Sequence, residues 1–196
     1  MLRNLIRKKQ ARLISFSMSH HDPSSRQRRK ALAAETLEIL QRGNYTTHDF
    51  SENDLSVGLS DSKAGTSSIL PTADLLLRGA QRPKRPTTVM DCVDDDTLSA
   101  AIRLSELGCS VAALNFASAK HPGGGWLNGA QAQEESVTRR STLYASLTSE
   151  GAQAFYATMR DAMQSGNDGM YTHAMIYSPM VSIIRDATPA EVPIST

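Results

Sequence analysis

The sequence lacks several features that would assign it to a particular environment. Its formal net charge is only +1, so no strong overall field attracts it to nucleic acid or to a membrane surface. It has no run of 18 apolar residues, and a membrane-spanning helix is therefore not expected. No group of His, Cys, Asp and Glu has the spacing of metal ligands. We expect no direct nucleic-acid binding, no membrane association, no metal and no cofactor.

Cysteine is also scarce. Cys92 and Cys109 are the only two, both lie in apolar contexts, and they do not form a CxxC motif. This pattern predicts buried, reduced thiols and hence a reducing compartment, so we expect an intracellular protein, either cytoplasmic or nuclear.

The first 22 residues lack acids almost completely. Five basic residues precede the first acid, Asp22, and several leucines and isoleucines fall near one helical face. A basic, amphipathic and acid-poor N-terminus resembles an organelle transit peptide, which would give a mitochondrial location. A basic tail or the outer start of a helix would explain the same residues.

The remaining pattern predicts an α/β domain without internal repeats. A helix is expected from about residue 23, with Gly43 at its end. The hydrophobic periodicity is weak over residues 45–86. Within this stretch, residues 69–79 predict at most a short helix, and the prolines of residues 81–86 indicate a connector.

The sequence again predicts regular secondary structure after the connector. Residues 86–93 and 109–117 read as buried strands, and residues 94–108 between them read as a helix, capped by Asp94–Asp96 and stopped by Gly108. Strand, helix and strand in this order predict a parallel βαβ unit with a right-handed crossover. Two helices, within residues 134–147 and 151–164, and a strand interrupted near Pro179 are expected to follow.

The stretch "NFASAKHPGGGWLNGAQAQEESVTRR" combines three glycines with two adjacent acids. Gly123–Gly125 have no Cβ, so a ligand can approach their backbone closely, although plain loop flexibility explains them equally well. Neither a Walker loop nor a GxGxxG fingerprint is present. Glu134 and Glu135 fall in the first turn of the next helix, about 100° apart, and therefore cannot perform the same task. Acids at that position also stabilise a helix dipole.

Taken together, the spacing GGG-x7-QEE, "LNFASAKHPGGGWLNGAQAQ" before it and "RRSTLYASL" after it resemble the microbial-type poly(ADP-ribose) glycohydrolases. The likeness extends over Ser24–Ala187. It implies a macrodomain-like, three-layer α/β/α fold with a mixed sheet, incomplete at its C-terminal end. The corresponding domain is expected over residues 23–187, between a basic tail at residues 1–22 and a short tail at residues 188–196.

The resemblance also implies roles for individual residues. Glu135 matches the general acid that protonates the leaving ribose oxygen of a ribose–ribose bond, and Glu134 matches the acid that binds ribose hydroxyls. Asn115, Gln133 and the backbone of Gly123–Gly125 match substrate-binding positions. The implied substrates and partners are ADP-ribose polymer or ADP-ribosylated proteins, and the implied chemistry needs neither metal nor cofactor. We expect Glu135 to hold its proton only in a site that ligand has closed, because burial favours the neutral acid.

The chain departs from the family toward its C-terminus. No glycine follows Gly169, whereas the family places a second glycine-rich loop, which holds the diphosphate, later in the chain. We therefore expect weak or absent activity of this chain, and an ADP-ribose-binding module without catalysis or a non-functional fragment stay open as alternatives. The oligomeric state is not indicated.

Three further residues near the motif allow two interpretations each. Trp126 either covers the site or packs in the interior. Arg139 and Arg140 either approach a phosphate or lie on a solvated helix face, and the second interpretation is favoured.

Overall fold

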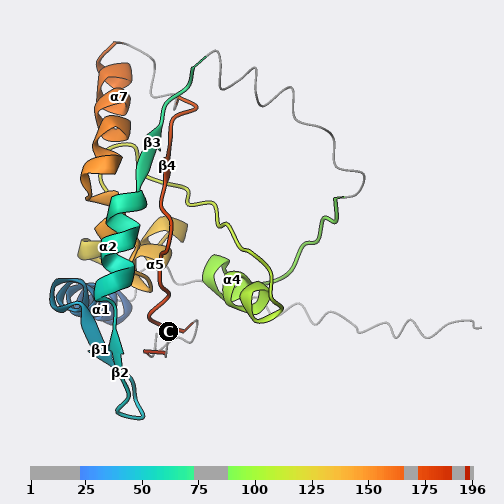
Figure 1. Cartoon of the computed structure of the whole chain (residues 1–196). Helices are drawn as coiled ribbons and strands as arrows, with labels where there is room; N and C mark the ends of the chain where they lie inside the picture. The colour runs from blue at the N-terminus through green and yellow to red at the C-terminus, as the bar shows by residue number, and fades with distance from the viewer. Residues whose placement is uncertain (1–22, 73–87, 166–171, 187–192, 195–196) are drawn as a thin grey trace, which may run out of the picture.

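The computed structural model describes residues 23–72, 88–165, 172–186 and 193–194 (Figure 1). The basic segment 1–22, most of the expected short helix and connector within residues 69–86, and most of the tail at residues 188–196 lie outside the described part.

The described part of the chain contains helices and short strands. The helical elements are α1 (Pro23–Arg42), α2 (Ser56–Gly65), α4 (Thr97–Glu106), η1 (Trp126–Asn128), α5 (Gln133–Arg139), α6 (Leu143–Leu147), η2 (Glu150–Ala152) and α7 (Gln153–Gln164). The strands are β1 (Asn44–Thr46), β2 (Glu52–Asp54), β3 (Ser67–Ile69) and β4 (Met175–Tyr177). The expected α/β class is confirmed.

The predicted first helix is confirmed as α1. Its buried residues Ala33, Thr36 and Ile39 recur every three positions and so share one face. Gly43 ends the helix with a φ of +75°, which a residue with a Cβ rarely adopts. The Thr36 hydroxyl donates a 2.7 Å hydrogen bond to the carbonyl oxygen of Arg139, and this bond ties α1 to the end of α5.

More structure forms in residues 44–69 than the weak sequence pattern predicts. β1 and β2 form an antiparallel hairpin in which Asn44 lies opposite Asp54. Asp54 then accepts a 2.8 Å hydrogen bond from the backbone N–H of Ser56, at the start of α2. α2 buries only Leu59 and Ser62, so its sequence has little hydrophobic periodicity and did not predict the helix.

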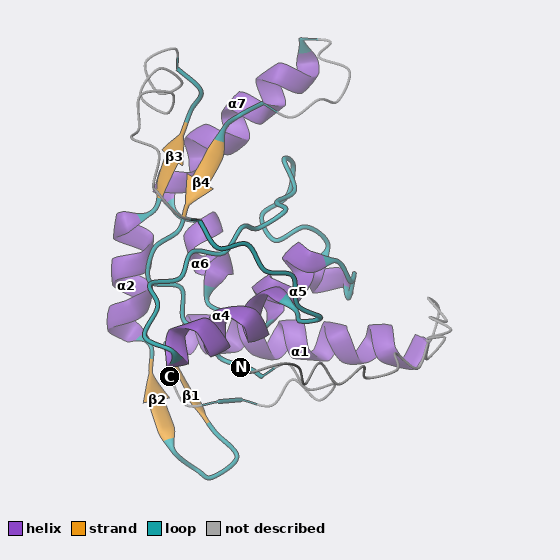
Figure 2. Cartoon of the chain, turned by 90° about the vertical axis from the view of Figure 1, so that its right-hand side faces the viewer, coloured by secondary structure: helices purple, strands orange, loops and turns teal. Residues whose placement is uncertain are grey.

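β3 and β4 form the second antiparallel pair, with Ser67 opposite Tyr177. α7 lies alongside this pair in both views (Figures 1 and 2). The interruption expected near Pro179 is confirmed, because β4 ends at Tyr177 and pairing resumes as isolated bridges, from Ser141 to Ile183 and from Arg185 to Pro193.

The expected helix after residue 94 is confirmed, but the strands on either side of it are not. Asp96 caps α4 by accepting hydrogen bonds from the backbone N–H groups of Leu98 and Ser99, and Gly108 follows the helix with a φ of +77°. Residues 88–93 and 109–117 carry no strand assignment. The parallel βαβ unit is therefore wrong for the described chain, because neither segment has a described strand beside it with which to form a ladder.

The absence of strands in these two segments also explains why the cysteines are exposed. Cys92 and Cys109 were expected to be buried, but both are exposed. Each lies in one of the two segments that do not form a strand, so neither is covered by a neighbouring strand or helix.

Three small hydrophobic clusters hold the described elements together. One joins α1, the hairpin, α2 and α6; a second lies under α7; a third joins α4, α5 and α6. Their buried members are Ile39, Tyr45, Leu55, Leu59, Ala145 and Ile184; Ala119, Ala152, Phe155, Tyr156 and Met159; and Leu98, Val137, Leu143 and Leu147. None of the described helices has both the length and the apolar character that crossing a bilayer requires.

Candidate functional site

The glycine motif forms a series of tight turns that leads into η1. The backbone N–H of Gly124 donates to the carbonyl oxygen of His121 over 2.9 Å, and that of Trp126 donates to Gly123 over 3.3 Å. Gly123 and Gly124 both have positive φ angles, +73° and +62°. A Cβ on Gly123 would lie 2.8 Å from Trp126 and 2.9 Å from Thr138, so only glycine fits between these two side chains.

Gly124 lies directly against the two acids of the motif. A Cβ at this position would clash with Oε1 of Glu135 and would lie 3.0 Å from Oε2 of Glu134. The missing side chain therefore allows the loop and both carboxylates to meet. This is the physical connection between the triple glycine and the paired acids.

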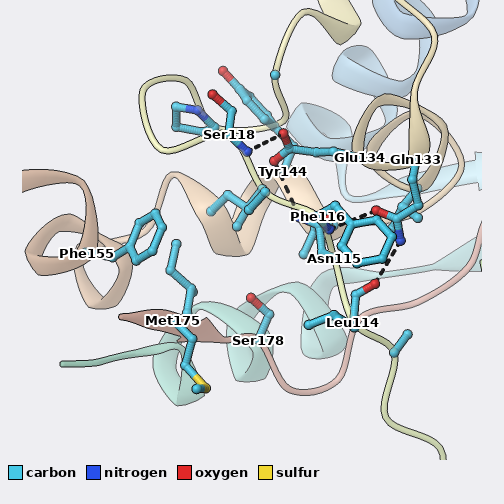
Figure 3. A pocket seen from close by; sticks show the side chains of 18 of the residues that line it. Leu114, Asn115, Phe116, Ser118, Gln133, Glu134, Tyr144, Phe155, Met175 and Ser178 are labelled. Carbon is cyan, nitrogen blue, oxygen red and sulfur yellow. Dashed lines mark hydrogen bonds between the residues drawn. The ribbon is translucent and has the colours of Figure 1, made fainter. Parts of the chain in front are cut away.

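Glu134 is buried, with 4% of its surface exposed. Its Oε2 accepts a 2.8 Å hydrogen bond from the backbone N–H of Ser118, and its Oε1 lies 3.4 Å from Nδ2 of Asn115 (Figure 3). Burial raises the pKa of the Glu134 carboxyl above its usual value, and the charge of Glu135 adds to the rise. Hydrogen bonds from Ser118, Asn115 and Gly123 only partly offset these effects on the pKa.

Glu135 points toward the glycine loop and is half-buried. Its Oε1 accepts a 2.9 Å hydrogen bond from the backbone N–H of Gly125. Among the described residues no donor contacts its Oε2. One oxygen is thus fixed by the loop and the other remains available to a ligand.

Gln133 holds the chain segment that carries Asn115. Its Oε1 accepts a 2.9 Å hydrogen bond from the backbone N–H of Phe116, and its Nε2 donates to the carbonyl oxygen of Leu114 over 2.8 Å (Figure 3). The same amide nitrogen lies 3.1 Å from Oγ1 of Thr97, at the start of α4. The side-chain amide therefore takes the place of a neighbouring strand's peptide group.

Asn115 completes the group of predicted residues. Its Nδ2 faces Glu134, while its Oδ1 is buried and accepts no hydrogen bond from any residue in the described part. The predicted catalytic and substrate-binding residues line one cavity, apart from Gly123, which precedes the cavity-lining Gly124. Asn115, Gln133, Glu134 and Glu135 come together although 17 residues of loop separate the first two.

Trp126 and Tyr144 line the cavity beside the carboxylates, and only the first of them was singled out in the sequence. Trp126 is buried and its ring lies 4.9 Å from that of Tyr144 at an angle of 55°, so it packs in the interior. Tyr156 is also buried, and its hydroxyl has no hydrogen-bond partner among the described residues. Burial raises the pKa of Tyr156 well above its usual value, with further rises from the charges of Glu134 and Tyr144.

The two arginines after the motif do not lie on a solvated face, contrary to expectation. Arg139 and Arg140 are 2% and 3% exposed. Nη1 of Arg140 lies 2.9 Å from Oδ1 of Asp96, and this ion pair connects the end of α5 to the cap of α4. They are buried because α1, α4 and α6 pack against the short helix α5, whose partly exposed residues, Gln133, Glu135 and Ser136, lie toward its start.

The described residues contain no group of three or more His, Cys, Asp and Glu that could hold a metal ion. The polar side chains that line the cavity include two carboxylates, several amides and hydroxyls, and the imidazoles of His121 and His173. Such groups bind hydroxyls, and the arrangement is suited to a neutral, hydroxyl-rich ligand next to a carboxylic acid.

Comparison with known proteins places this site in a family. A family model of the catalytic domain of microbial-type PARG matches residues 33–186. None of the curated proteins that were compared matches the chain.

Solved structures give the same relationship. The structure is similar to that of poly(ADP-ribose) glycohydrolase from Thermomonospora curvata, with a TM-score of 0.73 and 40% identity; the match covers 84% of this chain and 59% of that chain. It is similar, too, to the glycohydrolase from Deinococcus radiodurans in complex with ADP-ribose, with a TM-score of 0.58, 44% identity, and coverage of 70% and 55%. The chain thus spans less than two thirds of the length of the solved structures it matches.

Proposed function

The chain belongs to the family of microbial-type PARG catalytic domains, and we propose that it supplies the carboxylate half of a site that hydrolyses the ribose–ribose bonds of poly(ADP-ribose). One observation carries the proposal. The loop of Gly123–Gly125 closes directly onto Glu134 and Glu135, with the Gly125 N–H bound to Glu135 and no room for a Cβ on Gly124.

Glu135 acts as the general acid in this proposal. Its Oε1 is fixed by Gly125, so its carboxyl group is held toward the loop. The acid gives its proton to the ribose oxygen as the bond to the anomeric carbon breaks. Water then bonds to that carbon and returns a proton to the carboxylate, so the enzyme ends as it began. General acid catalysis of this kind contributes roughly 10²–10⁴-fold in rate.

Glu134 and Asn115 orient the ribose. The Oδ1 of Asn115 is buried without a partner in the described part, and a hydroxyl donor from a ligand would satisfy it. Glu134 is held in place by Ser118, and each carboxylate oxygen retains acceptor capacity for a second hydrogen bond. The raised pKa of Glu134 also favours a shared proton between this acid and a sugar hydroxyl.

Substrates and partners follow from the relatives. The Deinococcus radiodurans glycohydrolase is solved in complex with ADP-ribose, and a Thermomonospora curvata structure holds the inhibitor ADP-HPD. We infer that this chain recognises the ribose of an ADP-ribose unit, in a polymer or at the end of a chain attached to a protein.

The test compares release of labelled ADP-ribose from polymer by three proteins: the wild type, Glu135→Gln, and Glu150→Gln. Glu150 lies exposed in η2, far from the motif in sequence, so its replacement makes the same chemical change outside the cavity. Release should fall at least 100-fold in Glu135→Gln and stay unchanged in Glu150→Gln. Equal release by Glu135→Gln would refute the assignment of Glu135 as the acid.

Binding provides a second measurement. Calorimetry with ADP-ribose should show binding by the wild type and by Glu135→Gln, because the acid acts on the bond and not on the bound sugar. If the wild type binds ADP-ribose but none of the three proteins releases it from polymer, the alternative of an ADP-ribose-binding module is favoured.

A further inference from the structure

Three basic residues of α1 gather at the end of η1. Nε of Arg26 donates a 3.0 Å hydrogen bond to the carbonyl oxygen of Asn128. Nε of Arg29 donates a 2.8 Å bond to the carbonyl oxygen of Gly129. A Cβ on Gly129, whose φ is +70°, would lie 2.5 Å from the carbonyl oxygen of Arg26 and 3.1 Å from Cγ of Lys30. Glycine at this position therefore allows three cationic side chains to meet one turn of the chain.

The described residues do not balance the positive charge of this basic group. Arg26 is exposed, and Arg29 and Lys30 are partly exposed. No carboxylate in the described part of the chain forms an ion pair with any of the three. Within the same part, neither Nη atom of Arg26 and not Nη2 of Arg29 makes a hydrogen bond. Guanidinium N–H groups of this kind bind phosphate oxygens in pairs.

This arrangement of charge is unfavourable for α1 itself. Arg26 lies in the first turn, where the partial positive charge of the helix N-terminus repels a cation. Arg26 and Lys30 are four positions apart, and like charges at this spacing destabilise a helix. The first acid of α1 is Glu35, so no acid of the helix lies among these cations. Charges that disfavour the local structure without a local counter-charge are typical of a binding surface, and here they indicate an anionic ligand.

The basic group borders the candidate site. Asn128, which accepts the bond from Arg26, lines the same cavity as Glu134 and Glu135. One residue of η1 thus belongs to the wall of the cavity and also contacts the basic group. An ADP-ribose polymer has a diphosphate in every unit. A polymer whose ribose–ribose bond lies at Glu135 therefore carries phosphate charge outside the cavity as well as inside it.

We propose that Arg26, Arg29 and Lys30 form an accessory substrate site, which binds the diphosphate of an ADP-ribose unit next to the unit in the cavity. The site favours polymer over single ADP-ribose, because only a polymer can occupy the cavity and contact the basic group at once, and two linked contacts raise the affinity. This inference rests on the proposed function, since it takes ADP-ribose polymer as the ligand of the cavity.

The experiment measures the affinity for labelled ADP-ribose polymer and for single ADP-ribose in the Glu135→Gln variant, which should leave the polymer uncut. In this background, Arg26→Gln combined with Lys30→Gln should weaken polymer binding at least about 10-fold and leave the affinity for single ADP-ribose unchanged. The salt dependence of polymer binding should become shallower, because fewer phosphates lose their counterions on binding. Urea unfolding checks that the double variant folds.

Arg28→Gln is the matched control for Lys30→Gln, because each removes one positive charge from α1. Arg28 is exposed and makes no hydrogen bond or ion pair in the described part. Positions 26 and 28 point about 200° apart on a helix, so Arg28 faces away from Arg26. Lys30→Gln should weaken polymer binding, and Arg28→Gln should not. Equal weakening by both would show that net charge alone decides the affinity, and it would overturn the proposal.

Two other outcomes also overturn the accessory site. If the double variant loses affinity for single ADP-ribose as much as for polymer, the basic residues act only by holding η1. If single-stranded DNA with the same number of phosphates binds as tightly as polymer and is weakened by the same variant, the surface is a nucleic-acid site.

Release of ADP-ribose from polymer separates this inference from the proposed function. If Arg26→Gln with Lys30→Gln weakens polymer binding as expected but the wild type releases no ADP-ribose, the function is refuted and the accessory site stands. If release depends on Glu135 but the double variant binds polymer as tightly as its parent, the function stands and the accessory site is refuted. A chain that does not bind polymer refutes both.

Discussion

The backbone N–H of Gly125 donates a 2.9 Å hydrogen bond to Oε1 of Glu135. The bond joins the last glycine of the loop to the second acid of the motif, ten positions further along the chain. It explains why the two patterns occur together in the sequence: the loop positions the acid, and the absence of side chains on the loop makes room for it.

Gly124→Ala should abolish ADP-ribose binding, whereas Gly108→Ala should not affect it. Both glycines have positive φ angles, +62° and +77°, so each substitution costs about 1–2 kcal/mol of stability. Only at position 124 does the new Cβ also meet the carboxylates of Glu134 and Glu135; at position 108 nothing lies within 4 Å. Calorimetry with ADP-ribose and urea unfolding of both variants provide the measurement. If both variants lose ADP-ribose binding to a similar extent, backbone strain and not the clash with the two carboxylates causes the loss.

Glu134→Gln should change how stability depends on pH. The folded protein raises the pKa of Glu134 above its usual 4.5, so the protonated carboxyl is favoured by folding. That contribution is complete below pH 4.5 and is lost as the pH rises through the folded pKa. The wild type should therefore lose stability relative to Glu134→Gln as the pH rises above 4.5.

The measurement is the urea midpoint of both proteins across this range. Asp96 does not interfere: burial acts to raise its pKa, but hydrogen bonds from Ser99 and Arg140 outweigh this and lower the pKa below its usual 3.8, outside the range. A difference between the two proteins that stays constant with pH would show that Glu134 titrates normally.

Asp96→Asn should destabilise the protein more than Asp95→Asn. Asp96 faces Arg140, whose side chain is 4% exposed, across 2.9 Å, whereas Asp95 and Arg103 are 3.6 Å apart and both partly solvated. Asparagine keeps the cap of α4 but leaves the buried guanidinium without a counter-charge. We expect a loss of about 1–2 kcal/mol for Asp96→Asn, kept low because the Asp96 side chain is 43% exposed, and less than about 0.5 kcal/mol for Asp95→Asn. Thermal or urea unfolding checks the order; if capping alone mattered, both variants would be about as stable as the wild type, because asparagine keeps the cap.

Gln133→Ala should loosen the segment that carries Asn115. The Gln133 amide is the acceptor for the Phe116 N–H, so its removal should speed hydrogen exchange at that amide at least 10-fold. Gln131→Ala is the matched control, because Gln131 is exposed and makes no side-chain hydrogen bond in the described part. Unchanged exchange at Phe116 in Gln133→Ala would show that another group protects it.

Local signals in the sequence predicted the helices well and the strands poorly. The ends of α1 and α4 could be located because Gly43, Asp96 and Gly108 each perform a local task that their residue type allows. Residues 86–93 and 109–117 were predicted as strands because they are apolar and β-branched, but a strand also needs a partner. The pattern within one segment carries no information about whether that partner is present, and the same omission made the cysteines seem buried.

The sequence predicted more of the candidate site than of the fold around it. Glu134, Glu135, Asn115 and Gln133 converge as expected, because a long motif fixes their spacing. The sequence could not predict contacts that do not depend on residue type. Ser118 contributes only its backbone N–H to Glu134, and any residue type would do so. The arginines after the motif carry no local sign of the helices that enclose them.

Gln133 takes the place of a neighbouring strand for Leu114 and Phe116. Four of the bonds at the site join residues no more than 19 positions apart: Asn115 to Glu134, Phe116 to Gln133, Ser118 to Glu134, and Gly125 to Glu135. Closing a short loop costs little entropy, so these contacts can form early and without help from distant parts of the chain. These four bonds therefore involve a stretch of only about two dozen residues, against which the more distant helices α1 and α4 then pack.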